Sequence, residues 1–116
     1  MKKTVSLKEN HLFRRLYSKG QSAVSPYLAV YVRKNGRNGN RLGFTVSTKL
    51  GHAVVRNKVR RRLREIYRLH ETQFLPGYDL VVVARGRAMD APYAELEKAY
   101  LSLAEKLSLL RSEESQ

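Results

Sequence analysis

The sequence predicts an α+β fold, a two-layer sandwich in which helices cover one face of a mixed sheet and leave the other face partly open. Residues 27–33 and 41–47 alternate between apolar and polar positions, which is typical of half-buried strands. Residues 78–85 are apolar on both faces, as a central strand requires. In residues 53–70 and 93–110, apolar side chains recur every three or four positions, as on one face of a helix. The expected element order is α-β-β-β-α-β-α.

The first expected helix begins after Ser6. The pattern SLKE, from Ser6 to Glu9, matches a capping box in which Ser6 is the N-cap and Glu9 reaches back to it. The helix carries Phe13 and Tyr17, and it ends at Gly20, a residue suited to the left-handed conformation that closes many helices.

Strands are expected next. Residues 21–25 can be extended, and Pro26 interrupts the ladder because it has no backbone N–H. In the following strand, the core-facing residues are Leu28, Val30 and Val32. The other face of the same strand carries Tyr27, Ala29, Tyr31 and Arg33.

A turn rich in glycine and asparagine, residues 34–40, is expected to join two antiparallel strands. The strand after the turn places Leu42, Phe44 and Val46 inward. Its open face carries the small residues Gly43, Thr45 and Ser47. Small side chains there would leave room for a ligand.

The helix expected from residue 53 to about Gln73 has two different faces. Its apolar stripe consists of Val55, Val59, Leu63, Ile66 and His70. The opposite face consists of Asn57, Arg60, Arg61, Arg64 and Arg68, with Arg56 at the edge. Six of the nine residues from Arg56 to Arg64 are basic. This helix can therefore pack on a core while it presents a row of cations.

Asp90 and Pro92 are expected to start the last helix, after the buried strand at residues 78–85. Residues 111–116 are polar, and we expect them to form a flexible tail. A chain of this length fits one domain, residues 1–116.

Composition favours a polyanionic partner. The 116 residues carry a formal net charge of +13. Residues 1–88 contain 20 basic and 4 acidic side chains, whereas residues 89–116 contain 3 and 6. Cysteine is absent, and neither a signal peptide nor an apolar run long enough to span a membrane is visible. We therefore expect a cytoplasmic protein with a nucleic-acid partner, without a membrane or an obligate protein partner.

Catalysis by the polypeptide is not expected. The three histidines, His11, His52 and His70, lie in different elements, and neither Asp79 nor Asp90 is paired with one at a recognisable spacing. The sequence contains no metal-ligand cluster and no phosphate-cradling glycine loop.

The basic helix and the aromatic residues each have two interpretations. Charge runs are usually solvated surfaces, but six cations with no acidic residue between Arg56 and Glu65 would repel one another, which favours polyanion binding. Tyr27 and Tyr31 can be ordinary half-buried strand residues, which composition alone favours. Alternatively, exposed rings beside cations form a platform on which unpaired bases stack.

The segment from Lys49 to Glu65, KLGHAVVRNKVRRRLRE, resembles the signature of the protein subunit of bacterial ribonuclease P. The residues that match this pattern are Lys49, Gly51, Ala53, Val54, Arg56, Asn57, Arg60, Arg61 and Arg64. The resemblance implies a left-handed strand-helix-strand crossover, as in folds like ribosomal protein S5 domain 2. It also implies a protein that assists a catalytic RNA in removing the 5′ leader of precursor tRNA.

Roles for individual residues follow from the resemblance. Contact with the RNA subunit is expected from Arg56, Asn57, Lys58, Arg60, Arg61, Arg64 and Arg68. Contact with the single-stranded leader is expected from Phe13, Tyr17, Tyr27, Tyr31, Lys49 and Arg85. Catalysis would rest on Mg²⁺ held mainly by RNA phosphates, with no metal site and no catalytic residue in the protein.

Three alternatives remain. The first is a general single-stranded or ribosomal RNA-binding module without a dedicated catalytic RNA. The second is a protein nuclease that uses His52 or Asp79. The third, an amphipathic helix on a membrane surface, is disfavoured because the flanking strands need the apolar stripe of the basic helix for a core.

Overall fold

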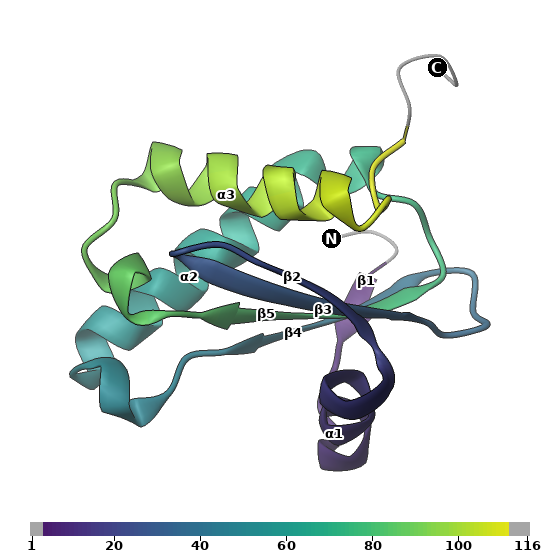
Figure 1. Cartoon of the computed structure of the whole chain (residues 1–116), viewed down its shortest axis with the longest axis horizontal. Coiled ribbons are helices and arrows are strands. Elements are labelled where there is room, and N and C mark those ends of the chain that lie inside the picture. The colour runs from purple at the N-terminus through teal and green to yellow at the C-terminus, as the bar shows by residue number, and fades with distance from the viewer. Residues whose placement is uncertain (1–3, 112–116) are drawn as a thin grey trace.

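One mixed β-sheet separates two helices from a third (Figure 1). The computed structural model describes residues 4–111. Its strands are β1 (Thr4–Ser6), β2 (Gln21–Val24), β3 (Leu28–Lys34), β4 (Asn40–Thr45) and β5 (Tyr78–Ala84). Its helices are α1 (Asn10–Lys19), α2 (Ala53–His70) and α3 (Tyr93–Lys106). Short 3-10 turns are η1 (Thr48–Leu50), η2 (Glu71–Gln73) and η3 (Gly86–Met89). The predicted α+β fold is confirmed.

The strand order is β1-β4-β5-β3-β2, with β5 in the centre. It pairs antiparallel with β3 and parallel with β4, and its residues Leu80, Val81 and Val82 are buried. The turn at residues 34–40 joins two strands that run antiparallel, as predicted, but these strands are not neighbours, because β5 lies between β3 and β4. A strand that is apolar on both faces needs a neighbour on each edge, so β5 takes the central place. The β4, α2 and β5 segments form the expected strand-helix-strand unit.

The chain begins differently from the prediction. Ser6, the predicted N-cap of the first helix, instead belongs to β1, which is parallel to β4, and the N–H of Leu7 donates to the Leu42 carbonyl at 2.9 Å. The α1 helix therefore begins at Asn10, with Glu9 as an N-cap that makes no side-chain capping bond. The backbone ladder on β4 satisfies more groups than a local capping box can.

Gly20 ends α1 in an extended conformation (φ −78°) and not in the predicted left-handed one. The residue is still constrained, because a Cβ there would lie 2.6 Å from the Leu16 carbonyl oxygen and 2.9 Å from that of Val32. The close approach of helix and strand, and not a left-handed turn, is what requires glycine here.

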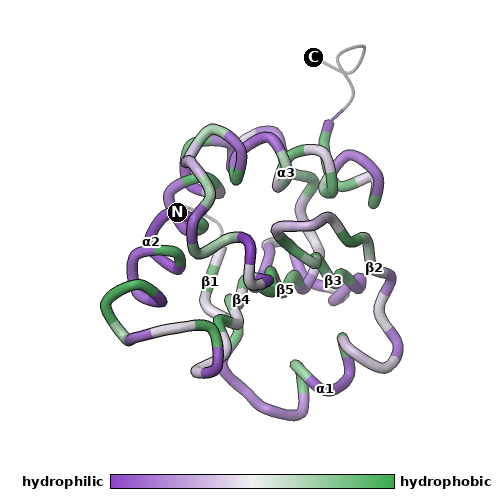
Figure 2. Tube along the Cα trace, turned by 60° about the vertical axis from the view of Figure 1, so that its left-hand side comes forward, coloured by the Kyte–Doolittle hydropathy of each residue, from purple (hydrophilic) through white to green (hydrophobic). Residues whose placement is uncertain are grey.

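Two apolar clusters lie on opposite faces of the sheet. The larger cluster joins the sheet to α2 and α3, and it includes Leu28, Val30, Val32, Leu42, Leu63, Ile66, Leu80, Val82, Leu96 and Leu103. The smaller one joins the sheet to α1 around Leu7, Leu16 and Val81. Figure 2 shows α1 alone on its side of the strands. The face under α2 and α3 is therefore closed, whereas the α1 face is only partly covered.

The predicted stripe of α2 is largely confirmed. Val59, Leu63 and Ile66 are buried, and so is Tyr67, which the prediction left out. Burial raises the pKa of Tyr67, and its hydroxyl contacts the hydroxyl of Thr4 at 2.7 Å. Because the polar tip has partners, this aromatic residue can lie in the core.

The C-terminal end of α3 is shorter than predicted. The helix stops at Lys106, and Ser108 has a positive φ of 59°. The chain then turns back, so that Leu109 is buried and Leu110 forms an antiparallel bridge with Phe74. Arg111 donates its backbone N–H to the Gln73 carbonyl at 2.7 Å. The rest of the tail expected to be flexible lies outside the described residues.

Candidate nucleic-acid interface

The first half of α2 presents cations on the side away from the core. The exposed side chains include Asn57, Lys58, Arg61 and Arg64. Val54 lies on the same side, and 80% of its surface is exposed. Within residues 4–111, no cation from Arg56 to Arg64 has a carboxylate partner in an ion pair. This surface therefore keeps its positive charge available.

Several cations of α2 are held in place without losing their charge. Arg56 donates from Nε to the Gly51 carbonyl at 3.1 Å, and Arg60 donates to Oδ1 of Asn57 at 2.9 Å. The guanidinium of Arg64 lies 6.0 Å from the centre of the Phe44 ring, within the range of a cation–π contact. Such contacts reduce the entropy that each side chain loses on binding.

Two arginines of α2 behave differently. Arg68 donates to Glu65 at 3.1 Å, and this hydrogen bond lowers the pKa of Glu65. Arg68 is thus the member of the predicted RNA-subunit set whose charge is already balanced. Arg62 turns toward the start of α3 and donates to the Ala91 carbonyl at 3.3 Å. Its half-buried position agrees with its place at the border of the apolar stripe.

Three aromatic rings meet on the other face of the sheet. The ring centres of Phe13 and Tyr17, one helical turn apart on α1, lie 6.5 Å apart. Tyr17 meets Tyr31 of β3 edge to face, with centres 5.0 Å apart. The Tyr17 hydroxyl contacts the Thr45 hydroxyl at 2.9 Å, yet 42% of the residue remains exposed. We call Phe13, Tyr17 and Tyr31 the aromatic cluster.

Gly43 of β4 leaves the space that the Phe13 ring of the aromatic cluster occupies. A Cβ at this position would lie 2.7 Å from Cζ of Phe13 and 3.3 Å from Cβ of Leu7. The sequence had suggested that small residues on this face leave room for a ligand. At Gly43, the Phe13 ring fills that room instead. The pairing register places Gly43 in line with Val81 and Tyr31 across the sheet.

Lys49 and Arg85 lie at one end of the same sheet. Because β4 and β5 are parallel, the segments that follow them begin at the same end of the sheet. The side chains of Lys49 and Arg85 are both exposed there. Arg85 donates from its backbone to the Tyr27 carbonyl and from Nη1 to the Ser25 carbonyl, each at 2.9 Å. These bonds fix the turn between β2 and β3 against the end of β5.

The alternation predicted that Tyr27 and Tyr31 share one face of the strand, and this prediction is wrong. Tyr27 precedes β3, and its half-buried ring packs against the larger apolar cluster. The guanidinium of Arg87 lies 5.4 Å from the centre of this ring. The bend at Pro26 ends the strand pattern before Tyr27, so the alternation does not extend to it.

With both surfaces described, the comparisons with known proteins identify the family. A model of the family described as Ribonuclease P matches residues 1–108. The chain belongs to this family. The ribonuclease P protein component of Alkaliphilus oremlandii is 44% identical over 112 residues, covering 97% of this chain and 98% of the relative.

Solved structures of ribonuclease P proteins have the same fold. The Staphylococcus aureus protein is 33% identical, with a TM-score of 0.85 over 91% of this chain and 97% of that one. The Thermotoga maritima protein is 31% identical, with a TM-score of 0.77 over 84% of this chain and 92% of that one. The five-stranded mixed sheet with three helices is thus the fold of bacterial ribonuclease P proteins.

The predicted ribonuclease P residues fall into two groups in space. Those of α2 lie on one side of the sheet, and the aromatic cluster lies on the other, with Lys49 and Arg85 at the end of the sheet. Tyr27 is separated from the aromatic cluster. Thr45 was expected on the open face but was given no binding role. Its hydroxyl contacts the Tyr17 hydroxyl at 2.9 Å, a contact that no local pattern indicates.

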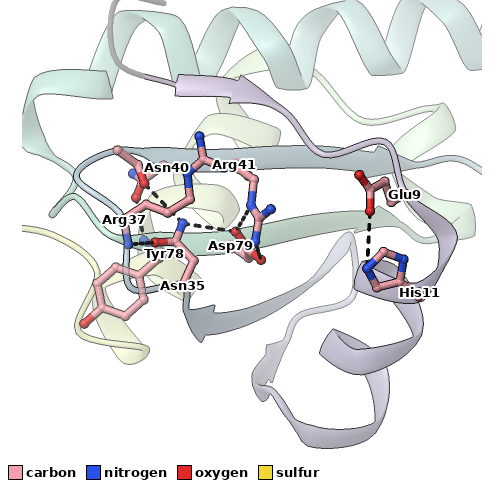
Figure 3. Close-up of polar contacts among 9 residues, drawn as sticks. Glu9, His11, Asn35, Arg37, Asn40, Arg41, Tyr78 and Asp79 are labelled. Carbon is pink, nitrogen blue, oxygen red and sulfur yellow. Dashed lines mark hydrogen bonds and ion pairs between the residues drawn. The ribbon is translucent and has the colours of Figure 1, made fainter.

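Asp79, one of the two residues considered for a nuclease, is held by hydrogen bonds from neighbouring side chains. Asp79 accepts from Nε and Nη2 of Arg41 at 2.7 and 2.8 Å and from Asn35 at 3.1 Å (Figure 3). The hydrogen bond to Asp79 raises the pKa of Arg41. His11 pairs with Glu9 at 3.2 Å, away from Asp79 in Figure 3. His52 occupies the N-cap position of α2 and makes no side-chain capping bond.

The described part of the chain contains no group of three or more His, Asp or Glu side chains placed to hold a metal ion. Within residues 4–111, no helix is both long and apolar enough to cross a membrane.

Proposed function

We propose that this chain works as the protein component of ribonuclease P, in which it binds the RNA subunit through α2 and the 5′ leader of precursor tRNA through the aromatic cluster. The observation that carries the proposal is the placement of a cationic surface and an aromatic surface on opposite faces of one sheet. A protein built this way can hold two RNA segments at once and keep them apart.

The α2 surface is suited to a folded RNA. Guanidinium groups donate in a planar fork that matches phosphate oxygens, and Arg61 and Arg64 are exposed without a carboxylate partner in the described residues. Phosphate contacts supply affinity but no sequence information, so the RNA subunit would be recognised by the arrangement of its phosphates.

The aromatic cluster is suited to single-stranded RNA. The exposed part of Tyr17 can stack with an unpaired base, which contributes about 1–3 kcal/mol per base and tolerates any base. Tyr31 and Thr45 hold the Tyr17 ring in place through the edge-to-face contact and the hydroxyl contact. A preorganised ring of this kind fits leaders of varied sequence.

We assign the hydrolysis of the phosphodiester bond to the RNA subunit. Asp79 is held by Arg41, and the chain offers no donor set for Mg²⁺ within residues 4–111, so we place that ion on RNA phosphates. When bound there, Mg²⁺ can activate the attacking water and stabilise the leaving oxygen. The protein's residues bind the leader and screen the charge between two polyanions.

The test compares precursor tRNAs with a long leader and with none, cleaved by the RNA subunit alone and by the holoenzyme at high Mg²⁺. We expect the protein to improve substrate affinity mainly for the long leader, and Tyr17→Ala to remove most of that gain. The matched variant Arg61→Ala should weaken binding of the RNA subunit and leave the leader-dependent gain intact. An equal benefit of the protein for both substrates would exclude the leader assignment.

Two further measurements separate the alternatives. Purification of the chain from its cell should yield one abundant structured RNA, whereas a mixed RNA population would support the general RNA-binding module. Cleavage of precursor tRNA by the RNA-free protein would contradict the assignment of catalysis to RNA and support a protein nuclease.

A further inference from the structure

Three charged residues form a row across the sheet, at the end opposite Lys49 and Arg85. The pairing register places Arg33 of β3 beside Asp79 of β5, and Asp79 beside Arg41 of β4. The row lies two residues from Tyr31 along β3, which is roughly 7 Å, and on the same face because side chains alternate along a strand. It is therefore a continuation of the α1 face.

The single carboxylate of this row is fully engaged. Asp79 is buried, accepts two hydrogen bonds from Arg41, and accepts a third from Asn35 (Figure 3). Asn35 also accepts from the backbone N–H of Arg37, which fixes the turn beside it. Arg33 lies beside the same carboxylate on the opposite strand, yet it has no ion-pair partner within residues 4–111.

The row faces a small hollow beneath α1. This hollow has a volume of about 120 Å³, and its walls include Arg15 from α1 together with Arg33, Lys34, Arg41 and Asp79. The side chains of Arg15, Arg33 and Arg41 thus lie around one acidic side chain that is already neutralised. Arg15 and Arg33 have no carboxylate partner in the described residues, so an anion in the hollow would meet two uncompensated cations.

We propose that this hollow binds a backbone phosphate of the leader, next to the nucleotides stacked on the aromatic cluster. The inference rests on the proposed function. The hollow is small enough for one phosphate group, and Arg15 and Arg33 border it from α1 and β3. Guanidinium groups bind phosphate through charge-assisted, bidentate hydrogen bonds.

Position in the fold favours the leader over the RNA subunit as the source of this phosphate. Arg15 belongs to α1, which also carries Phe13 and Tyr17, whereas α2 packs on the opposite face of the sheet. The first half of α2 adjoins η1 and η3, near Lys49 and Arg85. With the RNA subunit on α2, we place the leader nucleotides close to the cleavage point at that end, and the nucleotides farther upstream at Arg33.

The experiment measures holoenzyme affinity for precursor tRNAs whose leaders are lengthened one nucleotide at a time. In the wild type, affinity rises in one step when the leader passes the aromatic cluster and in a second step when it reaches the hollow. In Arg15→Gln/Arg33→Gln, we expect the second step to shrink by about tenfold and the first to persist. For long leaders, the salt slope should fall by about 0.7, as expected for the loss of one phosphate contact.

The matched control is Lys98→Glu, which changes the charge by the same two units on exposed α3, across the sheet. It should leave both steps unchanged. If the double variant does not fold, as judged by circular dichroism, Arg15→Gln on the exposed side of α1 tests the same hollow and should also reduce the second step.

Three results would overturn the inference. One is an equal loss of affinity for short and long leaders, and another is the persistence of the second step in the variants. The third is a weaker affinity for the RNA subunit alone, which would give the hollow to that RNA instead. A wild-type holoenzyme whose affinity never depends on leader length would contradict the proposed function itself, so the two failures are distinguishable.

Discussion

The two faces of the sheet differ in how many residues they bury. Within the described residues, the face under α2 and α3 buries twenty residues in one cluster, whereas the α1 face buries three. The closed face places Tyr67 and Tyr100 entirely out of water, but the α1 face leaves Tyr17 almost half exposed. Aromatic residues thus serve as core on one side and remain accessible on the other.

This difference separates stability from binding. Burial of apolar surface stabilises a fold by about 25 cal/mol per Å², so most of the stability comes from the closed face. The α1 face retains half-buried rings, and cations that have no carboxylate partner within residues 4–111, which a ligand can still cover. Substitutions on the two faces should consequently affect different measurements.

The largest expected effect is on the closed face. Leu63→Ala removes a side chain with no exposed surface from the centre of the larger cluster, and it should reduce the free energy of unfolding by about 2–5 kcal/mol. Urea denaturation of the isolated protein measures this loss. Tyr17→Ala is the control on the α1 face and should cost less than about 1 kcal/mol. Equal losses for the two variants would contradict the proposed division.

Gly43→Ala should have the next largest effect. The new methyl group meets the Phe13 ring at 2.7 Å, so the ring must move, at a cost of about 1–3 kcal/mol. Leader affinity should fall as well, because the aromatic cluster is displaced. In the double variant Phe13→Ala/Gly43→Ala the contact is absent, so its loss of stability should be smaller than the sum of the two single losses. Additive losses would show that the ring does not lie over Gly43.

High pH should weaken the closed face through Tyr100. Burial raises the pKa of Tyr100 well above its usual value, so the folded state keeps this proton while the unfolded state loses it above about pH 10. Stability from this group is complete below pH 10 and should fall by about 1.4 kcal/mol for each pH unit above it. The Tyr100→Phe variant should show a shallower decline in alkaline denaturation, and an unchanged slope would refute this origin.

The smallest expected effect on stability concerns the hydroxyl groups of Tyr67 and Tyr100. Tyr67→Phe removes contacts to Thr4 at 2.7 Å and Asn40 at 3.2 Å and should cost about 1 kcal/mol at neutral pH. Within residues 4–111, the buried hydroxyl of Tyr100 has no hydrogen-bond partner, so Tyr100→Phe should be neutral or slightly stabilising. Thermal unfolding at pH 7 measures both, and a larger loss for Tyr100→Phe would reverse this explanation.

Much of the fold could be predicted because local patterns and tertiary packing agree. Val59, Leu63 and Ile66 follow the helical period, and Leu80 to Val82 are apolar on both faces. The strand β1 could not be predicted, because three residues carry too little periodicity and their stability comes from pairing with β4. The place of β5 between β3 and β4 could not be predicted for a similar reason, since the neighbour of a strand depends on distant residues.

The functional surfaces divide in the same way. The basic run from Arg56 to Arg64 was visible in the sequence, because its six cations lie within nine consecutive residues of one helix. Arg61 and Arg64 lie on the exposed face of α2, where their surroundings are set by residues nearby in the sequence. The sequence alone was therefore sufficient to predict this cationic surface. By contrast, the contact of Tyr17 with Thr45 joins residues far apart in the chain, and no local pattern indicates it.

By itself, the sequence determined which residues are apolar, which are basic, and where helices and strands can form. Only the tertiary structure decided which distant residues are in contact. The insertion of β5 between β3 and β4 brings Arg33, Asp79 and Arg41 into one row, and the packing of α1 places Phe13 over Gly43. The physical reason is that pairing and packing depend on burying distant apolar surfaces together, and that free energy belongs to the whole chain.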